Sequence, residues 1–168
     1  MNLNDFIKRN NLKQTDAIVL KKRFLGLADH FVLFMGYRGN QPVFVANYKD
    51  GVQEVPMYEL QKYLKVLKPE RIERFPGSED ERKFAFKRAI SRIGERAYNY
   101  LGNNCGHYKN YVHYGINYSK QVDTAGNVGL TIGAGLGLAG VVSKNPKVAL
   151  WGTGILLAGL ILKELAKE

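Results

Sequence analysis

The feature that most constrains this 168-residue chain is its last quarter, where two long apolar runs follow one another. The first run, NVGLTIGAGLGLAGVV, begins at Asn127, and the second, VALWGTGILLAGLIL, begins at Val148. Neither run contains a charged residue, and SKNPK separates them. Helices that are apolar on every side must be buried, either in protein or in lipid.

Two interpretations of these runs stay open at this point. Each run has 15 or 16 residues, whereas a helix needs about 20 to cross a bilayer. Gly129, Gly133 and Gly137 are spaced so that helices can pack closely in lipid. A domain of this size has little room to bury two such helices. We therefore expect a membrane hairpin with its turn at residues 143–147, and a buried or oligomer-interface role is the alternative.

The rest of the chain, residues 1–126, is predicted to be one folded domain, followed by the apolar tail at 127–168. The formal net charge of +10 would attract anionic membranes and nucleic acids alike. No recognised nucleic-acid motif accompanies the basic residues, so we expect an anionic membrane surface as partner and no specific nucleic acid. Met1 to Leu12 is too polar for a signal peptide, and a lone cysteine is typical of a reducing compartment. The predicted location is intracellular.

Hydrophobic patterning within the domain predicts an α+β fold. The pattern indicates strands at 17–22, 30–36 and 42–48, and a further turn leads into VQEVP. Helices are predicted near 4–11, after Pro56, from Ser78 to about residue 97, and from Cys105 to Tyr114. The expected architecture is a small antiparallel sheet between about 17 and 76, packed on the two later helices.

The helix after Ser78 has a predicted apolar face and a basic remainder. Ser78 is a suitable N-cap, and acidic residues follow it in the first turn. The residues expected on the apolar face are Phe86, Ala89, Ile90, Ile93 and Ala97. We interpret the basic positions as a solvated face in preference to a binding surface.

Cys105 is the only cysteine, and its position at a predicted helix start favours the thiolate. A buried, inert thiol is the simpler alternative. His30 opens a strand that could lie beside this helix and accept the thiol proton. Asn47, on the next strand, could hydrogen-bond the far nitrogen of His30 and fix its tautomer. Backbone amides at the helix start could stabilise an oxyanion.

The other two histidines are interpreted as structural. His107 lies two residues after the cysteine, so on a helix it faces away from the thiol. His113 does not pair with His107 at the spacing of helical metal ligands, and no carboxylate cluster joins them. We therefore predict no metal and no cofactor.

Two segments of this chain resemble the motifs of a known family. DHFVLFMG, from Asp29, resembles the H-box, and NNCGHYKNYVHYG with the following SKQV resembles the NC motif, of the lecithin:retinol acyltransferase-like family. That family is similar in fold to the NlpC-type peptidases, a circularly permuted papain-like group. The resemblance covers about residues 14–122. It implies a permuted papain-like domain, with the apolar tail as an extension.

The resemblance also implies roles for single residues. Cys105 matches the family nucleophile and His30 its general base. Asn47 falls where many members have a second histidine, which is a departure, although asparagine orients the imidazole in papain-like enzymes. Gly106 replaces the usual glutamate and Tyr108 the usual phenylalanine. These departures weaken the argument for one specific lipid reaction.

The function implied is thiol-dependent acyl transfer from a phospholipid, or its hydrolysis, through an acyl-cysteine thioester at a membrane surface. Many relatives carry a C-terminal membrane anchor, which supports the membrane hairpin. The catalytic domain is expected on the cytoplasmic side. Two alternatives stay open. One is a cysteine amidase or peptidase of the NlpC type, and the other is a non-catalytic interaction module that keeps the fold.

Overall fold

The computed structural model describes residues 3–22, 28–66, 69–97, 99 and 103–167. It divides into two compact units, Met1–Asn117 and Tyr118–Glu168. The boundary predicted from composition, after residue 126, falls inside the first helix of the second unit. The reason is that the helix begins with two polar turns before its apolar run, so composition changes later than structure does.

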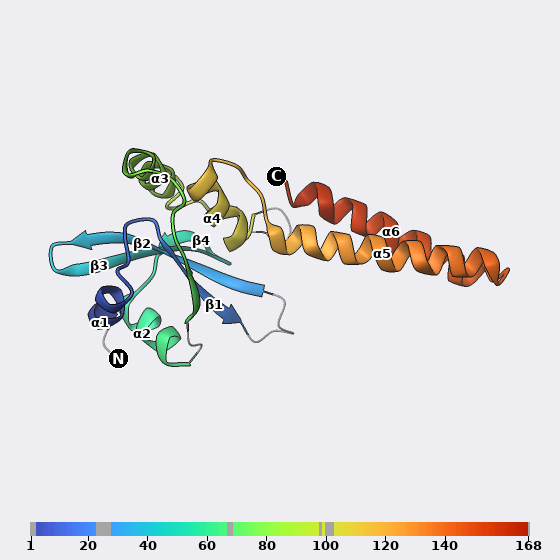
Figure 1. The fold of residues 1–168 in the computed structure, drawn as a ribbon, viewed down its shortest axis with the longest axis horizontal. Helices are drawn as coiled ribbons and strands as arrows, with labels where there is room; N and C mark the ends of the chain where they lie inside the picture. The colour runs from blue at the N-terminus through green and yellow to red at the C-terminus, as the bar shows by residue number, and fades with distance from the viewer. Residues whose placement is uncertain (1–2, 23–27, 67–68, 98, 100–102, 168) are drawn as a thin grey trace. The chain divides into compact units, whose positions relative to one another are not determined.

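The described residues of the first unit contain a five-stranded antiparallel sheet in the order β4-β3-β2-β1-β5 (Figure 1). The strands are β1 (Ala17–Lys22), β2 (Ala28–Arg38), β3 (Gln41–Tyr48), β4 (Gly51–Glu54) and β5 (Pro69–Glu73). The predicted α+β class and the predicted strands are confirmed. Strand β5 was not predicted, because a proline and three charged residues in PERIE are untypical of a strand interior. An edge strand tolerates both.

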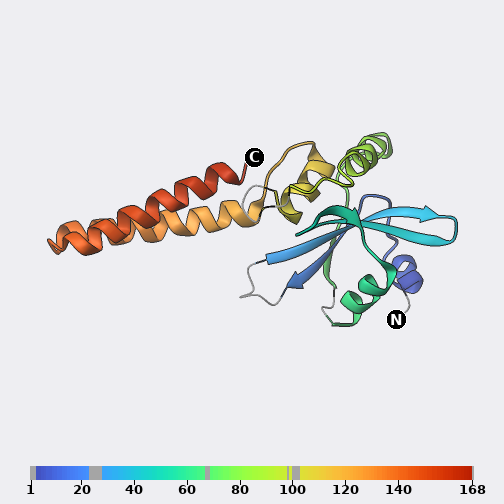
Figure 2. The ribbon, with the colours of Figure 1, turned by 180° about the vertical axis from the view of Figure 1, so that it is seen from behind.

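Helices cover both faces of this sheet (Figures 1 and 2). They are α1 (Leu3–Arg9), α2 (Met57–Val66), α3 (Glu79–Ser91) and α4 (Cys105–Tyr114). Side chains alternate along β2, as in any strand. Phe31, Leu33 and Met35 pack in one cluster with α3 and α4, whereas Val32 and Phe34 pack in a second cluster with α1 and α2. Odd-numbered side chains on this part of β2 therefore pack toward α3 and α4, and even-numbered ones pack toward α1 and α2.

Helix α3 begins as predicted and ends earlier. The Ser78 side chain caps the amide of Glu81, and the Glu81 carboxylate accepts from the Ser78 amide at 2.7 Å. The helix ends at Ser91, not near residue 97. Gly94 follows with a φ of +91°, a left-handed conformation that is incompatible with a right-handed helix.

The predicted apolar face of α3 is partly wrong. Its buried residues are Arg82, Ala85 and Ala89, whereas Ile90 and Ile93 are 45% and 40% exposed. Arg82 is buried because it reaches a buried carboxylate, as described next.

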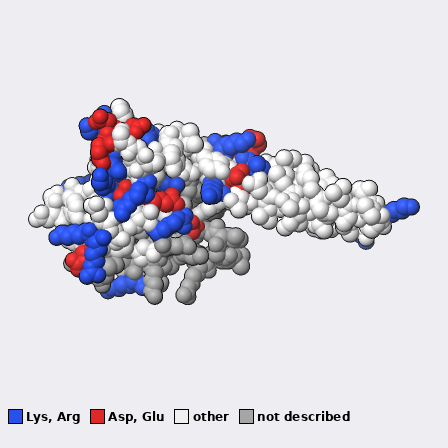
Figure 3. Space-filling model, in the orientation of Figure 1, with Lys and Arg blue, Asp and Glu red and all other residues white. Residues whose placement is uncertain are grey.

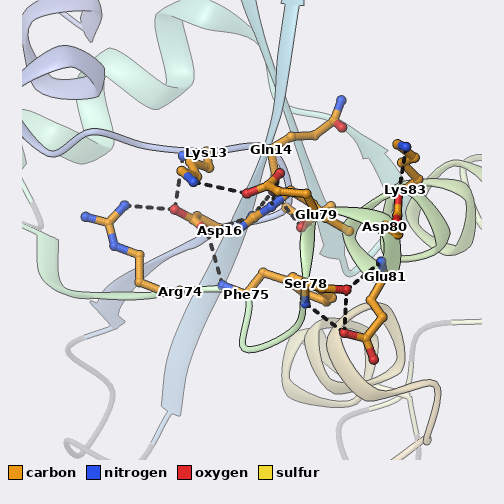
Figure 4. Close-up of polar contacts among 12 residues, drawn as sticks. Lys13, Gln14, Asp16, Arg74, Phe75, Ser78, Glu79, Asp80, Glu81 and Lys83 are labelled. Carbon is orange, nitrogen blue, oxygen red and sulfur yellow. Dashed lines mark hydrogen bonds and ion pairs between the residues drawn. The ribbon is translucent and has the colours of Figure 1, made fainter.

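That carboxylate belongs to Asp16, which is fully buried at the start of β1 (Figure 4). It accepts hydrogen bonds from Arg74 at 2.8 Å, from Arg82 at 3.1 Å, and from the amides of Lys13 and Phe75, both at 3.0 Å. Burial alone would raise the pKa of Asp16, but these four donors hold it below its usual value. Asp16 thus fastens β1 to α3 and to the segment after β5.

The second unit is a hairpin of two helices, α5 (Lys120–Val142) and α6 (Pro146–Leu165). The Asn145 side chain caps α6 by accepting from the amide of Lys147 at 3.1 Å. Glycines bring the helix backbones together: a Cβ on Gly140 would lie 2.2 Å from the Ala149 nitrogen, and one on Gly152 would lie 2.2 Å from the Gly137 nitrogen. The predicted helical hairpin with its turn near 143–147 is confirmed.

Candidate active site

Cys105 is the first residue of α4, as the sequence predicts. The side chain is 7% exposed, and the thiol donates a hydrogen bond to the Asp29 carbonyl oxygen at 3.3 Å. Asp29 lies at the start of β2 and directly precedes His30. The fold therefore brings the start of the cysteine helix to the start of the histidine strand, although they are far apart in the sequence.

The first turn of α4 is capped by Asn104. Its side-chain oxygen accepts from the amides of Gly106 at 2.8 Å and His107 at 3.2 Å. The fully buried His107 ring accepts in return from the Asn104 amide at 3.4 Å. His107 thus has the hydrogen-bonding role predicted for it. Two of the amides expected to stabilise an oxyanion are engaged by Asn104 in this arrangement.

His30 is buried at 2% exposure, and its ring lies on the α1–α2 side of the sheet. Leu20, directly opposite it on β1, belongs to the cluster on that side. The His30 ring lies 5.2 Å from the ring of Tyr48, which packs on the same cluster. Cys105 belongs to the other cluster. The structure thus brings the thiol to the backbone beside His30, whereas the imidazole ring packs on the opposite face of the sheet.

Asn47 holds the loop that leads into α4. Its amide donates to the backbone oxygen of Asn103 at 3.2 Å and to the side-chain oxygen of Asn103 at 3.3 Å. Asn103 in turn donates to Glu95 and to the Ala97 carbonyl oxygen, both at 2.9 Å. Asn47 therefore lies near the Cys105 helix, as predicted, but its amide positions the helix start and not the His30 ring.

A chain of charged side chains runs from Asp29 to α4, which the sequence reasoning missed. Arg71 pairs with Asp29 at 3.0 Å and with Glu73 at 2.8 Å, and Glu73 pairs with Lys109 at 2.8 Å. Lys109 lies one helical turn after Cys105, on the same face of α4. The available signal was the two-residue spacing of Arg71 and Glu73, which puts both on one face of a strand.

This charged chain is partly withdrawn from water. The Lys109 side chain is 9% exposed, and its ammonium lies 5.2 Å from the centre of the Phe31 ring. Burial alone would raise the pKa of Glu73, but hydrogen bonds from Lys109 and Arg71 hold it below its usual value. Arg71 also pairs with Asp29, so the network holds in place the residue whose carbonyl oxygen accepts the hydrogen bond from the Cys105 thiol.

His113 is a structural residue, as expected. Its Nε2 lies 2.8 Å from the Thr15 carbonyl oxygen, and the side chain is 5% exposed. Burial lowers its pKa from 6.5 to about 4, so the ring is neutral and donates to that carbonyl. Within the described ranges, no group of three or more His, Cys, Asp or Glu side chains could hold a metal ion.

Comparison with known proteins adds no relative. No model of a known protein family matches this chain, and no curated protein matches it.

Proposed function

We propose that this chain is a membrane-attached thiol enzyme that removes an acyl group from a phospholipid through a thioester on Cys105. The observation that carries the proposal is the 3.3 Å hydrogen bond from the Cys105 thiol to the residue before His30. It joins the two segments that resemble the NC motif and the H-box of the lecithin:retinol acyltransferase-like family. The permuted papain-like topology is part of the same proposal.

In the proposed reaction, His30 takes the thiol proton and the Cys105 sulfur attacks the ester carbonyl carbon. The ester C–O bond breaks as the departing alkoxide takes the proton from His30, which leaves an acyl thioester on Cys105. Water, an amine or an alcohol then attacks the thioester and gives up its own proton, which returns to the sulfur through His30. With water the enzyme is a phospholipase, and with an amine or alcohol it is an acyltransferase.

This chemistry requires two local changes from the arrangement described above. The thiol must leave the Asp29 carbonyl oxygen, because that hydrogen bond stabilises the protonated sulfur. The start of β2 must also rearrange, so that the His30 side chain moves from the face of the sheet with Tyr48 to the face with α4. We propose that lipid binding at the start of α4 drives both changes.

A non-catalytic interaction module is the second candidate, and the side-chain directions favour it. His30 packs on Tyr48, and Asn47 binds Asn103. In this alternative the fold is kept while Cys105 is a core residue.

Turnover by matched variants separates the two candidates. Full-length protein is incubated with anionic phospholipid vesicles, and with a peptide-amide substrate in parallel, to detect the NlpC-type alternative. We expect lysophospholipid from the wild type and none from Cys105→Ala or His30→Gln, while His107→Gln, at a histidine that caps the helix, keeps part of the activity. Folding of each variant is checked by circular dichroism. A folded wild type without turnover on either substrate would favour the non-catalytic module.

A further inference from the structure

We propose that the α5–α6 hairpin crosses the bilayer completely, so that its turn at residues 143–145 lies in the headgroup layer opposite to the one where the hairpin begins and ends. The occupant of its outer surface is lipid hydrocarbon. This inference does not depend on the chemistry at Cys105, because it is drawn from the second unit alone.

The spacing of charges along the hairpin matches a bilayer. Asp123 and Lys163 pair at 3.7 Å near one end, and Lys144 and Lys147 lie at the other. At 1.5 Å per residue, about 28 Å of α5 lie between Asp123 and the helix end at Val142, and about 24 Å of α6 lie between Lys147 and Lys163. The hydrocarbon layer is about 30 Å thick, so charged groups fall at both of its borders.

Both helices carry exposed apolar side chains. Leu138 is 69% exposed on α5, and Leu150 is 74% exposed on α6. A helix that lies along a membrane surface needs one polar face, whereas residues 124–143 and 148–162 contain no charged side chain. The face visible in Figure 3 accordingly shows neither blue nor red along the middle of the hairpin. Both are long and apolar enough to cross a membrane, which favours full insertion.

Polar groups inside the apolar stretch are satisfied within the hairpin. The Thr131 hydroxyl donates to the Asn127 carbonyl oxygen at 2.9 Å, and the Thr153 hydroxyl donates to the Ala149 carbonyl oxygen at 3.0 Å. The Asn127 side chain, near the charged end, accepts from Lys163 at 2.9 Å. Such internal pairing is what a hydrocarbon environment demands, because lipid offers no hydrogen-bond partners.

The two ends of the hairpin lie together, and an aromatic residue lies near the turn. The Ser119 amide donates to the Ala166 carbonyl oxygen at 2.8 Å, so the unit begins and ends at one border. Trp151 is 72% exposed one turn after Lys147, which is where an aromatic side chain would meet the second border. The turn and the first turns of α6 then lie at that border.

The test measures depth and sidedness of single labels in the full-length chain. Cys105→Ser removes the native cysteine, and three further variants each introduce one: Lys49→Cys in the first unit, Gly135→Cys in mid-hairpin and Ser143→Cys at the turn. Residue 135 is a suitable position, since a Cβ there meets nothing within 4 Å. Fluorophores at 135 and 143 are quenched by lipids that carry spin labels in the headgroup or deep in the acyl chain. An impermeant maleimide is added to vesicles whose residue 49 faces outward.

A crossing hairpin predicts that the deep quencher acts most on position 135 and the headgroup quencher most on position 143. In intact vesicles, position 143 should react with the maleimide at least about tenfold more slowly than position 49, and at a similar rate after detergent, because the bilayer blocks the reagent. Deepest quenching at 143 would show a hairpin that ends inside the bilayer. Equal labelling of 143 and 49 in intact vesicles would place the turn on the near side. Either result overturns the proposal, as does failure of the chain to float with vesicles.

Discussion

Cys105 and Asp29 show how one hydrogen bond can decide the state of a candidate nucleophile. The thiol donates to a carbonyl oxygen, which requires the proton to stay on sulfur. Asp29 is itself held by Arg71, and Arg71 by Glu73. The sequence identified Cys105 from its isolation and its helix start, but the residues that fix its partner come from a strand that the sequence did not reveal.

Glu73→Gln tests how far this charged chain stabilises the first unit. The change leaves the buried Lys109 ammonium without its carboxylate, so we expect the free energy of unfolding to fall by about 2 kcal/mol in urea denaturation. Adding Lys109→Met should recover part of the loss, because both charges are then removed. Glu54→Gln, at an exposed carboxylate paired with the exposed Arg38, is the control and should change little. Equal effects of the two glutamate changes would contradict a buried role for Glu73.

His113 should make the stability of the first unit depend on pH. Its folded-state pKa of about 4 lies below its usual 6.5, so the unfolded chain takes up the proton first as the pH falls. Stability attributable to this residue is complete above about pH 7 and decreases between pH 6.5 and 4. The loss from pH 7.5 to 5 amounts to about 2 kcal/mol.

Urea denaturation of the wild type and His113→Gln at both pH values measures this contribution. The glutamine amide can still donate to the Thr15 carbonyl oxygen but does not titrate. The variant should therefore show a smaller loss on acidification by about 2 kcal/mol. The pKa values of Asp16 and Glu73 are lowered and lie below both pH values of the measurement, so these carboxylates contribute little to the comparison. An unchanged difference between the two pH values would show that His113 is not buried as described.

At the scale of the elements, sequence patterns predicted most helices and strands but not the direction of side chains in the site. The bounds of β1 and α4 agree with prediction. β1 is an apolar run with β-branched residues, and the Gly and Asn residues of LGNN precede α4 in the sequence. The face of His30 could not be predicted. Helices cover both faces of β2, so HFVLFMG is apolar at nearly every position and its two-residue alternation is hidden.

The same limit applies to α3 and to Asn47. The helical spacing of apolar residues suggested Ile90 and Ile93 as core, but Ile93 lies beyond the helix end at Ser91, and on α3 it is Arg82 that is buried, beside Asp16. These isoleucines instead line a groove with Val43. Asn47 was predicted to orient His30 because they lie on neighbouring strands. Its actual partner, Asn103, lies far along the chain, and no local pattern indicates that contact.

Packing between α5 and α6 depends on glycines at the points of backbone contact. Gly152→Ile would place a side chain where a Cβ lies 2.2 Å from the Gly137 nitrogen, so the helices must separate. Gly154→Ile is the matched control, since a Cβ there meets nothing within 4 Å. Spin labels at Thr131→Cys and Leu157→Cys in the Cys105→Ser chain report the interhelical distance. We expect a longer and broader distribution for Gly152→Ile alone, and equal distributions for both variants would contradict glycine-mediated packing.

At the scale of the whole molecule, the two units have separate physical bases. The first has two apolar clusters, one on each face of its sheet, whereas the second has backbone contacts between glycine-rich helices and an exposed apolar surface. The boundary that composition suggests, after residue 126, lies nine residues after Asn117, because the first turns of α5 are polar. The sequence could not distinguish a crossing hairpin from a buried one, because both need the same apolar composition.

Truncation after Asn117 should therefore leave a folded first unit that has lost its attachment to lipid. We expect the truncated chain to unfold cooperatively on heating, as measured by circular dichroism. It should not float with neutral vesicles, whereas the full chain should. Anionic vesicles should retain some of the truncated protein, because its basic residues attract the headgroups by on the order of 1 kcal/mol each. A truncated chain that aggregates would show that the hairpin is part of its core.

The most direct test of the central claim is intact-protein mass spectrometry after brief exposure of the full-length chain to mixed phospholipid vesicles. The proposed mechanism predicts a mass increase equal to one fatty acyl group, located on the peptide that contains Cys105 and removed by hydroxylamine, which cleaves thioesters. Cys105→Ser should lack the hydroxylamine-sensitive adduct, and His30→Gln should form it far more slowly. Lipid turnover that persists in Cys105→Ala, or a folded wild type that forms no adduct and releases no lysophospholipid, would contradict acyl chemistry at this cysteine.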